Sequence, residues 1–164
     1  MNLYEILEKL NIQFEEKKHE PVTTIEEALK IADMIKGLGT KSLFLHDKKK
    51  HYYLVIAEEN KRINIKEIAH IVGKSSLSFA SPERLMEVLG LEAGSVTPFG
   101  IINDHENKVK ILIDEELKGK RLLFHPNTNC KTISVEFDDL IKFIEFEEHS
   151  YLFFQLEMRE QSGV

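Results

Sequence analysis

Apolar residues recur at helical spacing in five stretches of the chain. Near the N-terminus, Leu or Ile occupies positions 3, 6, 7 and 10, which predicts a first helix. Each of the other four stretches begins at a residue typical of a helix start, and three of them end at a glycine. With their start residues and closing glycines, these predicted helices are 28–35 (Thr24 with Glu27, Gly37), 65–72 (Asn64 with Glu67, Gly73), 82–89 (Ser81 with Pro82, Gly90) and 140–145 (Asp138).

Short runs rich in β-branched and aromatic residues predict strands between these helices. Runs 41–46 and 52–57 flank the polar stretch 47–50, so they predict a hairpin. The other predicted strands are 14–19, 100–103, 108–113, 122–125 and 132–136. Since strands outnumber helical crossovers, the pattern favours an α/β chain of the α+β type, with a mixed, mostly antiparallel central sheet and flanking helices. The tail 151–156 could be an edge strand, a packing segment or a partner surface.

Composition places the chain among ordinary globular proteins. A length of 164 residues fits one domain, expected to span 1–164, and 42% of the residues are hydrophobic. Cys130 is the only cysteine, which excludes an intrachain disulfide and favours a reducing compartment. No secretory signal and no stretch long enough to span a membrane is visible, so we expect a cytoplasmic protein with no membrane partner.

Charge is distributed unevenly along the chain. The net charge of −6 argues against a general nucleic-acid binder, and we expect no DNA partner. Residues 36–62 nevertheless carry seven Lys or Arg and three Asp or Glu, whereas residues 136–160 carry two and eight. A local basic surface could therefore contact one phosphate strand. The stretch Asp47-Lys48-Lys49-Lys50 is also typical of a solvated hairpin turn, and composition alone favours this interpretation.

The loop Gly94-Ser95-Val96-Thr97-Pro98-Phe99-Gly100 is the strongest candidate for a binding element. Its two glycines would permit a positive φ and close approach of a ligand, and Pro98 stiffens the chain between them. Because the loop carries no charge, it is suited to hold a carbonyl or phosphate oxygen with backbone N–H donors. A second polar cluster, 125–129, directly follows the apolar run 122–124.

Two single residues have both a chemical and a structural interpretation. Lys41 begins an apolar strand, where it could snorkel to water or direct its charge at a phosphate or oxyanion. His125 could be a satisfied histidine at a strand end or a group that orients a substrate. Dinucleotide, P-loop and nucleophile-elbow motifs are absent, and neither the histidines nor Cys130 show metal-ligand spacing. We therefore expect no cofactor and no metal.

Five stretches of the chain are specific when taken together and in order. They are 39–45 (GTKSLFL), 77–85 (LSFASPERL), 89–91 (LGL), 94–104 (GSVTPFGIIND) and 124–129 (FHPNTN). This set resembles the prolyl-tRNA editing proteins of the YbaK superfamily, also called the bacterial prolyl-tRNA synthetase insertion-domain family. The length also resembles the freestanding branch that deacylates alanyl-tRNA for proline, tRNA(Pro).

The resemblance implies a YbaK-like fold and hydrolysis of a mischarged aminoacyl ester on the 3′-terminal adenosine of tRNA(Pro). It implies that Lys41 contacts the terminal phosphate or ribose, that Gly94 and its loop offer donors to the ester carbonyl, and that His125 lies beside the aminoacyl group. A water would attack with help from the substrate's ribose hydroxyl, without metal or cofactor. The substrate-binding residues implied are Ser42, Ser95, Val96, Thr97, Pro98, Phe99, Gly100 and Asn127. The expected partner is the aminoacylated acceptor end, with prolyl-tRNA synthetase as a candidate.

The favoured amino acid stays open at this point. Ser42 stands where relatives often carry Asn, which could alter the ribose contacts or the size of the pocket. A missing methylene changes binding by only about 1–3 kcal/mol, so a synthetase needs a second, smaller site to remove alanine. Alanyl-tRNA(Pro) is the preferred substrate, and cysteinyl-tRNA(Pro) is the alternative. Non-catalytic interpretations are a module that binds aminoacyl-tRNA or a synthetase, and a pocket for a free small molecule.

Overall fold

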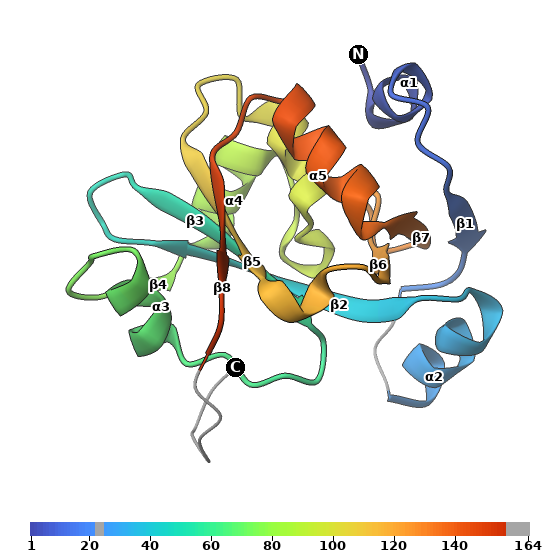
Figure 1. Cartoon of the computed structure of the whole chain (residues 1–164), viewed down its shortest axis with the longest axis horizontal. Coiled ribbons are helices and arrows are strands. Elements are labelled where there is room, and N and C mark those ends of the chain that lie inside the picture. The colour runs from blue at the N-terminus through green and yellow to red at the C-terminus, as the bar shows by residue number, and fades with distance from the viewer. Residues whose placement is uncertain (22–24, 157–164) are drawn as a thin grey trace.

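A mixed sheet of eight strands organises the part of the chain that the computed structural model describes, residues 1–21 and 25–156 (Figure 1). The strands are β1 (Glu15–Lys18), β2 (Leu38–His46), β3 (Tyr52–Glu58), β4 (Ser78–Phe79), β5 (Val109–Asp114), β6 (Arg121–Phe124), β7 (Lys131–Glu136) and β8 (Tyr151–Phe154). Their order is β1-β7-β6-β2-β3-β5-β8, and β4 pairs with β2. Pairs β1–β7, β6–β7, β2–β3 and β2–β4 are antiparallel, while β2–β6, β3–β5 and β5–β8 are parallel. The predicted mixed, mostly antiparallel sheet is confirmed.

Helices cover both faces of this sheet. The α-helices are α1 (Leu3–Lys9), α2 (Ile25–Met34), α3 (Ile65–Ile71), α4 (Pro82–Leu89) and α5 (Phe137–Phe146), and three 3₁₀ turns are η1 (Ala93–Ser95), η2 (Pro98–Asn103) and η3 (Glu115–Leu117). Alternate residues of β3 belong to two separate cores. Leu54 and Ile56 pack with residues of α1, α4, α5 and η2, whereas Val55 and Ala57 pack with residues of α3. Because side chains alternate along a strand, the two cores lie on opposite faces of the sheet.

The predicted helix starts are largely correct. The Asn64 side chain accepts hydrogen bonds from the N–H groups of Lys66 and Glu67 at the start of α3. Ser81 caps α4 in the same way, and Gly90 ends that helix in the left-handed conformation, with φ 66°. The cap predicted at Thr24 lies outside the described residues. Asp138 does not cap the last helix, because α5 already begins at Phe137 and the acidic side chain falls in its first turn.

The strand predicted at 100–103 is wrong. These residues belong to η2, which begins with Pro98 at its first position and with the Thr97 side chain as its cap. Phe99 and Ile101 of this turn are buried in the larger core. The proline start and the side-chain cap favour a helical turn locally, and burial of the apolar residues then stabilises it.

The 47–51 turn between β2 and β3 is solvated, as composition favoured. Lys48, Lys49 and Lys50 are exposed. Asp47 organises the turn, since its carboxylate accepts hydrogen bonds from the N–H groups of Lys49 and His51 and also contacts Lys74. The other hairpin prediction, antiparallel pairing of β2 with β3, is confirmed from Thr40 opposite Glu58 to His46 opposite Tyr52.

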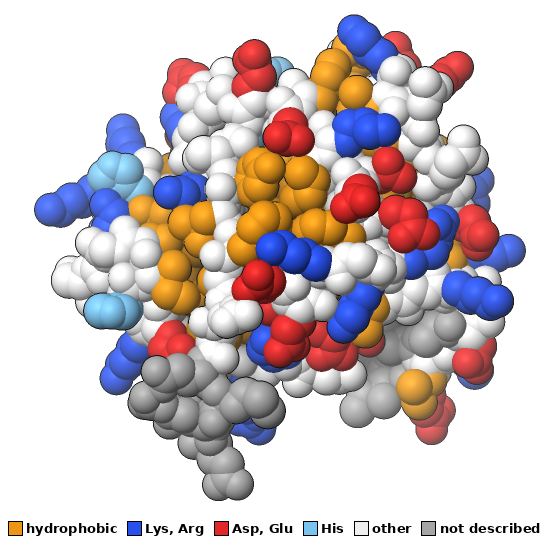
Figure 2. All heavy atoms as spheres, viewed as in Figure 1, with side chains coloured by type: hydrophobic (Ala, Val, Ile, Leu, Met, Phe, Trp, Pro, Cys, Tyr) orange, Lys and Arg blue, Asp and Glu red, His pale blue; other side chains and the backbone are white. Residues whose placement is uncertain are grey.

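The tail forms β8, which lies at one edge of the sheet beside β5. Figure 2 shows apolar side chains gathered on this face over β8, with charged groups around them. The Lys118 ammonium lies 4.1 Å from the centre of the Phe153 ring of β8. None of the helices in the described ranges is long and apolar enough to cross a membrane.

Candidate active site

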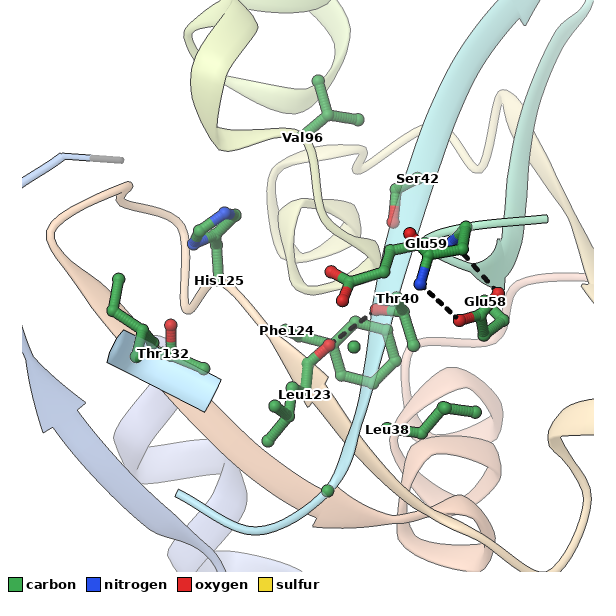
Figure 3. Close-up of a pocket in the computed structure, with 14 residues that line it drawn as sticks. Leu38, Thr40, Ser42, Glu58, Glu59, Val96, Leu123, Phe124, His125 and Thr132 are labelled. Atoms are coloured by element: carbon green, nitrogen blue, oxygen red, sulfur yellow. Dashed lines mark hydrogen bonds between the residues drawn. The ribbon is translucent and has the colours of Figure 1, made fainter. Parts of the chain in front are cut away.

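A cavity of about 410 Å³ opens where β2 and β6 meet, beside the end of β3 (Figure 3). Thr40 and Ser42 of β2 line it, as do Phe124 and His125 at the end of β6. Val96 lines the cavity from the loop between η1 and η2. This volume lies in the usual range of small-molecule sites, about 300–1,000 Å³, and exceeds what one small side chain requires.

The junction of β2 and β6 is held by a side chain of the cavity wall. The parallel pairing of these strands is short, joining Leu38 to Leu122 and Gly39 to Leu123. The Thr40 hydroxyl extends it by donating a hydrogen bond of 2.6 Å to the carbonyl of Leu123. Thr40 therefore fixes the position of the strand end from which Phe124 and His125 enter the cavity.

The ring of His125 is held in one orientation. Its Nδ1 lies 3.1 Å from the carbonyl oxygen of Lys131. Because a carbonyl only accepts hydrogen bonds, Nδ1 must carry the proton, and in the neutral ring Nε2 is then an acceptor. Figure 3 shows the ring beside Thr132, facing the cavity. Thr132 itself is engaged by His19, whose Nε2 lies 2.8 Å from its hydroxyl.

Two carboxylates at the end of β3 form the acidic side of the cavity. Glu58 accepts hydrogen bonds from the backbone and side-chain N–H groups of Asn60, at 3.0 and 3.2 Å. Glu59 bends back over β2, against Gly39. Although Glu59 as a residue is solvent-accessible, desolvation of its carboxyl group raises its pKa, and the charge of Glu58 raises it further.

A second hollow of about 220 Å³ adjoins the first. Ser42 and Val96 line both, so these two residues lie at the boundary between the hollows. The second hollow is otherwise apolar, and its walls include Phe79 of β4 and Ala80. Phe79 is 49% exposed, which is unusual for a large aromatic residue.

Lys41 is not among the residues that line either hollow. It pairs with Ala57, whose side chain belongs to the core on the α3 side. Because side chains alternate along β2, Lys41 leaves the sheet on the face opposite to Thr40 and Ser42. Burial lowers its pKa, the nearby charge of Arg62 lowers it further, and Glu58 counteracts this effect.

The conformation and exposure of the glycine loop, residues 94–100, differ from those that the sequence predicted. Neither Gly94 nor Gly100 has a positive φ. Gly94 is exposed and does not line the cavity, and of the loop only Val96 does so. The other predicted binding residues of the loop are buried in the protein: Ser95, Thr97, Pro98, Phe99 and Gly100. Gly100 is required for packing, since a Cβ there would lie 2.6 Å from Cδ1 of Leu91.

Asn127 links the polar cluster after β6 to this loop. It adopts the left-handed conformation, with φ 64°, and its side-chain amide donates to the carbonyl of Phe99 over 3.4 Å. It lines neither hollow. Within the described ranges, its Oδ1 is a buried atom without a hydrogen-bond partner.

The structure thus brings Ser42, Val96 and His125 of the predicted site together. Thr40 and Glu59 also line the cavity and were not among the predicted site residues. The sequence did contain a signal that Glu59 lies near β2. The predicted hairpin places the residues after Ala57 beside those that precede Lys41.

Comparison with known proteins gives a consistent result. Residues 19–143 match the aminoacyl-tRNA editing domain family. The chain is 36% identical over 147 residues to the prolyl-tRNA editing protein ProX of Acetoanaerobium sticklandii, covering 88% of this chain and 90% of that protein. It is 32% identical over 151 residues to prolyl-tRNA synthetase associated domain-containing protein 1 of Danio rerio, covering 90% and 82%.

Solved structures share the fold. A protein proposed as a trans-editing enzyme for prolyl-tRNA synthetase superposes with a TM-score of 0.70 at 19% identity, covering 94% of this chain and 95% of that one. At this level of identity the likeness concerns the fold alone.

Proposed function

Because the chain belongs to the aminoacyl-tRNA editing domain family, we propose that it hydrolyses the ester bond of alanyl-tRNA(Pro) at the 3′-terminal adenosine. Its relatives identify it as a prolyl-tRNA editing protein and an aminoacyl-tRNA deacylase. Alanine as the amino acid, the acceptor end of tRNA(Pro) as the binding partner, and residues 1–164 as a single editing domain are parts of the proposal.

The observation that carries the proposal is the cavity beside His125. Its walls near the ring are Val96, Leu123 and Phe124, which carry no charge. An uncharged wall suits a small apolar side chain such as that of alanine. Exclusion of proline is part of the proposal and is assigned to His125, whose ring the Lys131 carbonyl holds, because the cavity as a whole is larger than one small side chain requires.

The two hollows fit the two parts of the substrate end. We place the aminoacyl group in the larger hollow and the adenine base in the apolar one, where the exposed ring of Phe79 can stack on it. The ribose joins base and ester, so it belongs between them, beside Ser42. The Ser42 hydroxyl makes no hydrogen bond within the described part of the chain and can serve the ribose.

Donors for the ester carbonyl come from the loop. Three of its N–H groups already donate locally, those of Ser95, Phe99 and Gly100. Val96 is the loop residue that lines the cavity, and we assign its N–H as the donor to the ester carbonyl. A water attacks the carbonyl carbon, the C–O bond to the ribose breaks, and the products are free alanine and tRNA with a restored hydroxyl. Lys41 leaves β2 on the face opposite to Thr40 and Ser42, so we assign it no contact with the ester and propose that it contacts a phosphate of the tRNA outside the cavity.

Deacylation of a panel of substrates tests the proposal. The protein is incubated with alanyl-, cysteinyl- and prolyl-tRNA(Pro), and loss of the ester is followed over time. We expect rapid loss of alanine and slow loss of proline. Faster release of cysteine than of alanine would assign the cysteinyl substrate instead. Equal inertness toward all three would exclude the proposed function.

A further inference from the structure

The Glu59 side chain folds over the inside of the cavity. A Cβ built at Gly39 would lie 2.4 and 2.5 Å from its two carboxylate oxygens, so the carboxylate occupies the space that a side chain at position 39 would take. The Glu59 N–H also donates to the Gly39 carbonyl over 3.0 Å. In Figure 3 the carboxylate reaches across Thr40, toward the side of the cavity where His125 lies.

This carboxylate has no partner in the described ranges of the chain. It forms no ion pair and accepts no hydrogen bond there, in contrast to Glu58, which Asn60 holds. Other polar groups of the wall are already engaged. The Thr40 hydroxyl donates to Leu123, and Nδ1 of His125 donates to Lys131. Desolvation and the charge of Glu58 both raise the pKa of Glu59, so a bound cation would relieve two unfavourable interactions.

An aminoacyl ester offers a cation at the right place. Its α-amino group is attached to the carbon next to the ester carbonyl, and α-amino groups have a pKa of about 7.7–8.0, so they are mainly cationic at neutral pH. With the ester at the Val96 and His125 wall, the amino group lies inside the same cavity. A charge-assisted hydrogen bond to a carboxylate is among the stronger contacts available there.

We propose that Glu59 binds the α-ammonium group of the substrate and restricts the site to esters whose amino group is free. The inference rests on the proposed function and adds to it a positioning residue. Selection at this cavity then has two parts: the uncharged wall senses the side chain, and Glu59 senses the amino group. Peptidyl-tRNA and other N-blocked esters are poor substrates for this reason.

A cycle of one substitution and one substrate modification tests the inference. The kcat/KM of wild type and Glu59→Gln is measured on alanyl-tRNA(Pro) and on N-acetyl-alanyl-tRNA(Pro). For wild type, acetylation is expected to lower kcat/KM about tenfold to a hundredfold, the range for a hydrogen bond between charged groups. Relative to wild type, Glu59→Gln should lose a similar factor of kcat/KM on alanyl-tRNA(Pro). Acetylation of the substrate should then lower the kcat/KM of Glu59→Gln only slightly further. An equal loss on both substrates, or no loss on either, would overturn the inference.

Glu58→Gln is the matched control, since the neighbouring carboxylate lines the same cavity but is held by Asn60. Whatever its activity, it should respond to acetylation as the wild type does. Binding of non-hydrolysable 3′-alanylamino-adenosine and its N-acetyl derivative, measured by calorimetry, separates the two hypotheses. If wild type deacylates no substrate, the proposed function fails. Tighter binding of the free-amine analogue, lost in Glu59→Gln, would still support the inference, and equal binding of both analogues would overturn it.

Discussion

Three features of its surroundings affect the pKa of Lys41: burial, the Glu58 carboxylate and the Arg62 guanidinium. Burial and the proximity of Arg62 lower its pKa, and Glu58 partly restores it. The side chain is half-buried and lies outside the cavity, so its removal should affect binding of the nucleic acid more than folding. We expect Lys41→Ala to lower kcat/KM for deacylation at least about tenfold, with a change in unfolding free energy within about 0.5 kcal/mol.

Measurement of kcat/KM at several salt concentrations, together with urea unfolding, checks this expectation. A lysine that contacts phosphate contributes to the salt dependence of binding, so the slope against salt should be smaller in Lys41→Ala. Lys41→Arg, which keeps the charge, should recover part of the activity. Turnover and salt dependence equal to those of wild type in Lys41→Ala would contradict the assigned role.

Individual site residues were predictable from the sequence only where they lie within a recognisable local sequence motif. Ser42, Val96 and His125 lie within stretches that the family resemblance covers, and all three line the cavity. The face on which Lys41 leaves β2 depends on the alternation of the strand relative to two cores, which a single sequence does not define. Glu59 matters only because Gly39 leaves room for its carboxylate, a relation between two strands.

At the scale of elements, the two glycines of the loop from η1 to η2 differ in their surroundings. A Cβ at Gly94 would approach only Nδ2 of Asn129, at 3.3 Å, whereas a Cβ at Gly100 would collide with Leu91. We therefore expect Gly100→Val to destabilise the fold by about 1–3 kcal/mol, the usual cost of overpacking. Gly94→Val should leave the unfolding free energy nearly unchanged and yet stop turnover, because its bulk blocks approach of the substrate to the loop.

Thermal unfolding and deacylation of both variants provide the comparison. Each variant serves as the control for the other, since the substitution is the same and the positions are six residues apart. An active Gly94→Val would remove the loop from the proposed site. A Gly100→Val protein as stable as wild type would show that Leu91 and the surrounding core can shift to accommodate the larger side chain.

The wrong strand prediction at 100–103 shows a limit of predicting secondary structure from local sequence patterns. The hydrophobic residues of this stretch are compatible with a strand, and periodicity alone does not decide between a short strand and a helical turn. Pro98 and the Thr97 cap were local signals for the turn. The decisive contribution is tertiary: the Phe99 ring packs edge-on against Phe124 and Phe143, at 5.6 and 5.1 Å between ring centres.

The short strand β4 was missed entirely, although it presents the aromatic surface of the second hollow. If Phe79 stacks on the terminal base, Phe79→Ala should raise KM about tenfold, because stacking on an aromatic side chain contributes about 1–3 kcal/mol per base. Phe79→Tyr, which keeps the ring, should behave like wild type. The experiment compares KM and kcat on alanyl-tRNA(Pro) for both variants. An unchanged KM in Phe79→Ala would place the base elsewhere.

At the scale of the whole molecule, the site exists because strands distant in the sequence pair with each other. β2 joins β6 through only two residue pairs, and β3 joins β5 in parallel. The sequence predicts the hairpin between β2 and β3, since a short turn connects them. It contains no comparable local signal for the parallel pairs, whose partners are brought together by burial of both sheet faces. The class of the fold was therefore predictable, and the order of the strands was not.

A buried ion pair connects the end of η2 to the segment before β8. Nε2 of His149 lies 2.9 Å from Oδ2 of Asp104, and both side chains are almost completely buried. Nδ1 of His149 lies 2.8 Å from the carbonyl of Glu147. Both partners accept hydrogen bonds, so both ring nitrogens carry protons and the ring is an imidazolium. Asp104 also accepts hydrogen bonds from the N–H groups of Lys108 and Val109.

Burial alone would lower the pKa of His149, but its hydrogen bonds to Asp104 and Glu147 outweigh burial and raise the pKa above the ordinary 6.5. For Asp104, burial would raise the pKa, and hydrogen bonds from His149 and the backbone lower it below the ordinary 3.8. The histidine contribution to stability is complete below about pH 6.5 and is lost as pH rises through the folded pKa. The aspartate contribution is present above about pH 4 and is lost as pH falls through its own folded pKa.

The pair should therefore stabilise the protein most between about pH 4 and 6.5, and the free energy of unfolding should decrease toward alkaline pH. His149→Gln leaves Asp104 buried without its cation, which costs about 3–5 kcal/mol near pH 6. Because the wild-type ring loses its charge at high pH, the difference between the two proteins should shrink as pH rises from 6 to 9. Urea unfolding at several pH values measures this difference, and the subtraction removes the titration of the other histidines. A difference that stays constant over this range would mean that His149 is neutral in the folded protein, and that Asp104 holds it by hydrogen bonding alone.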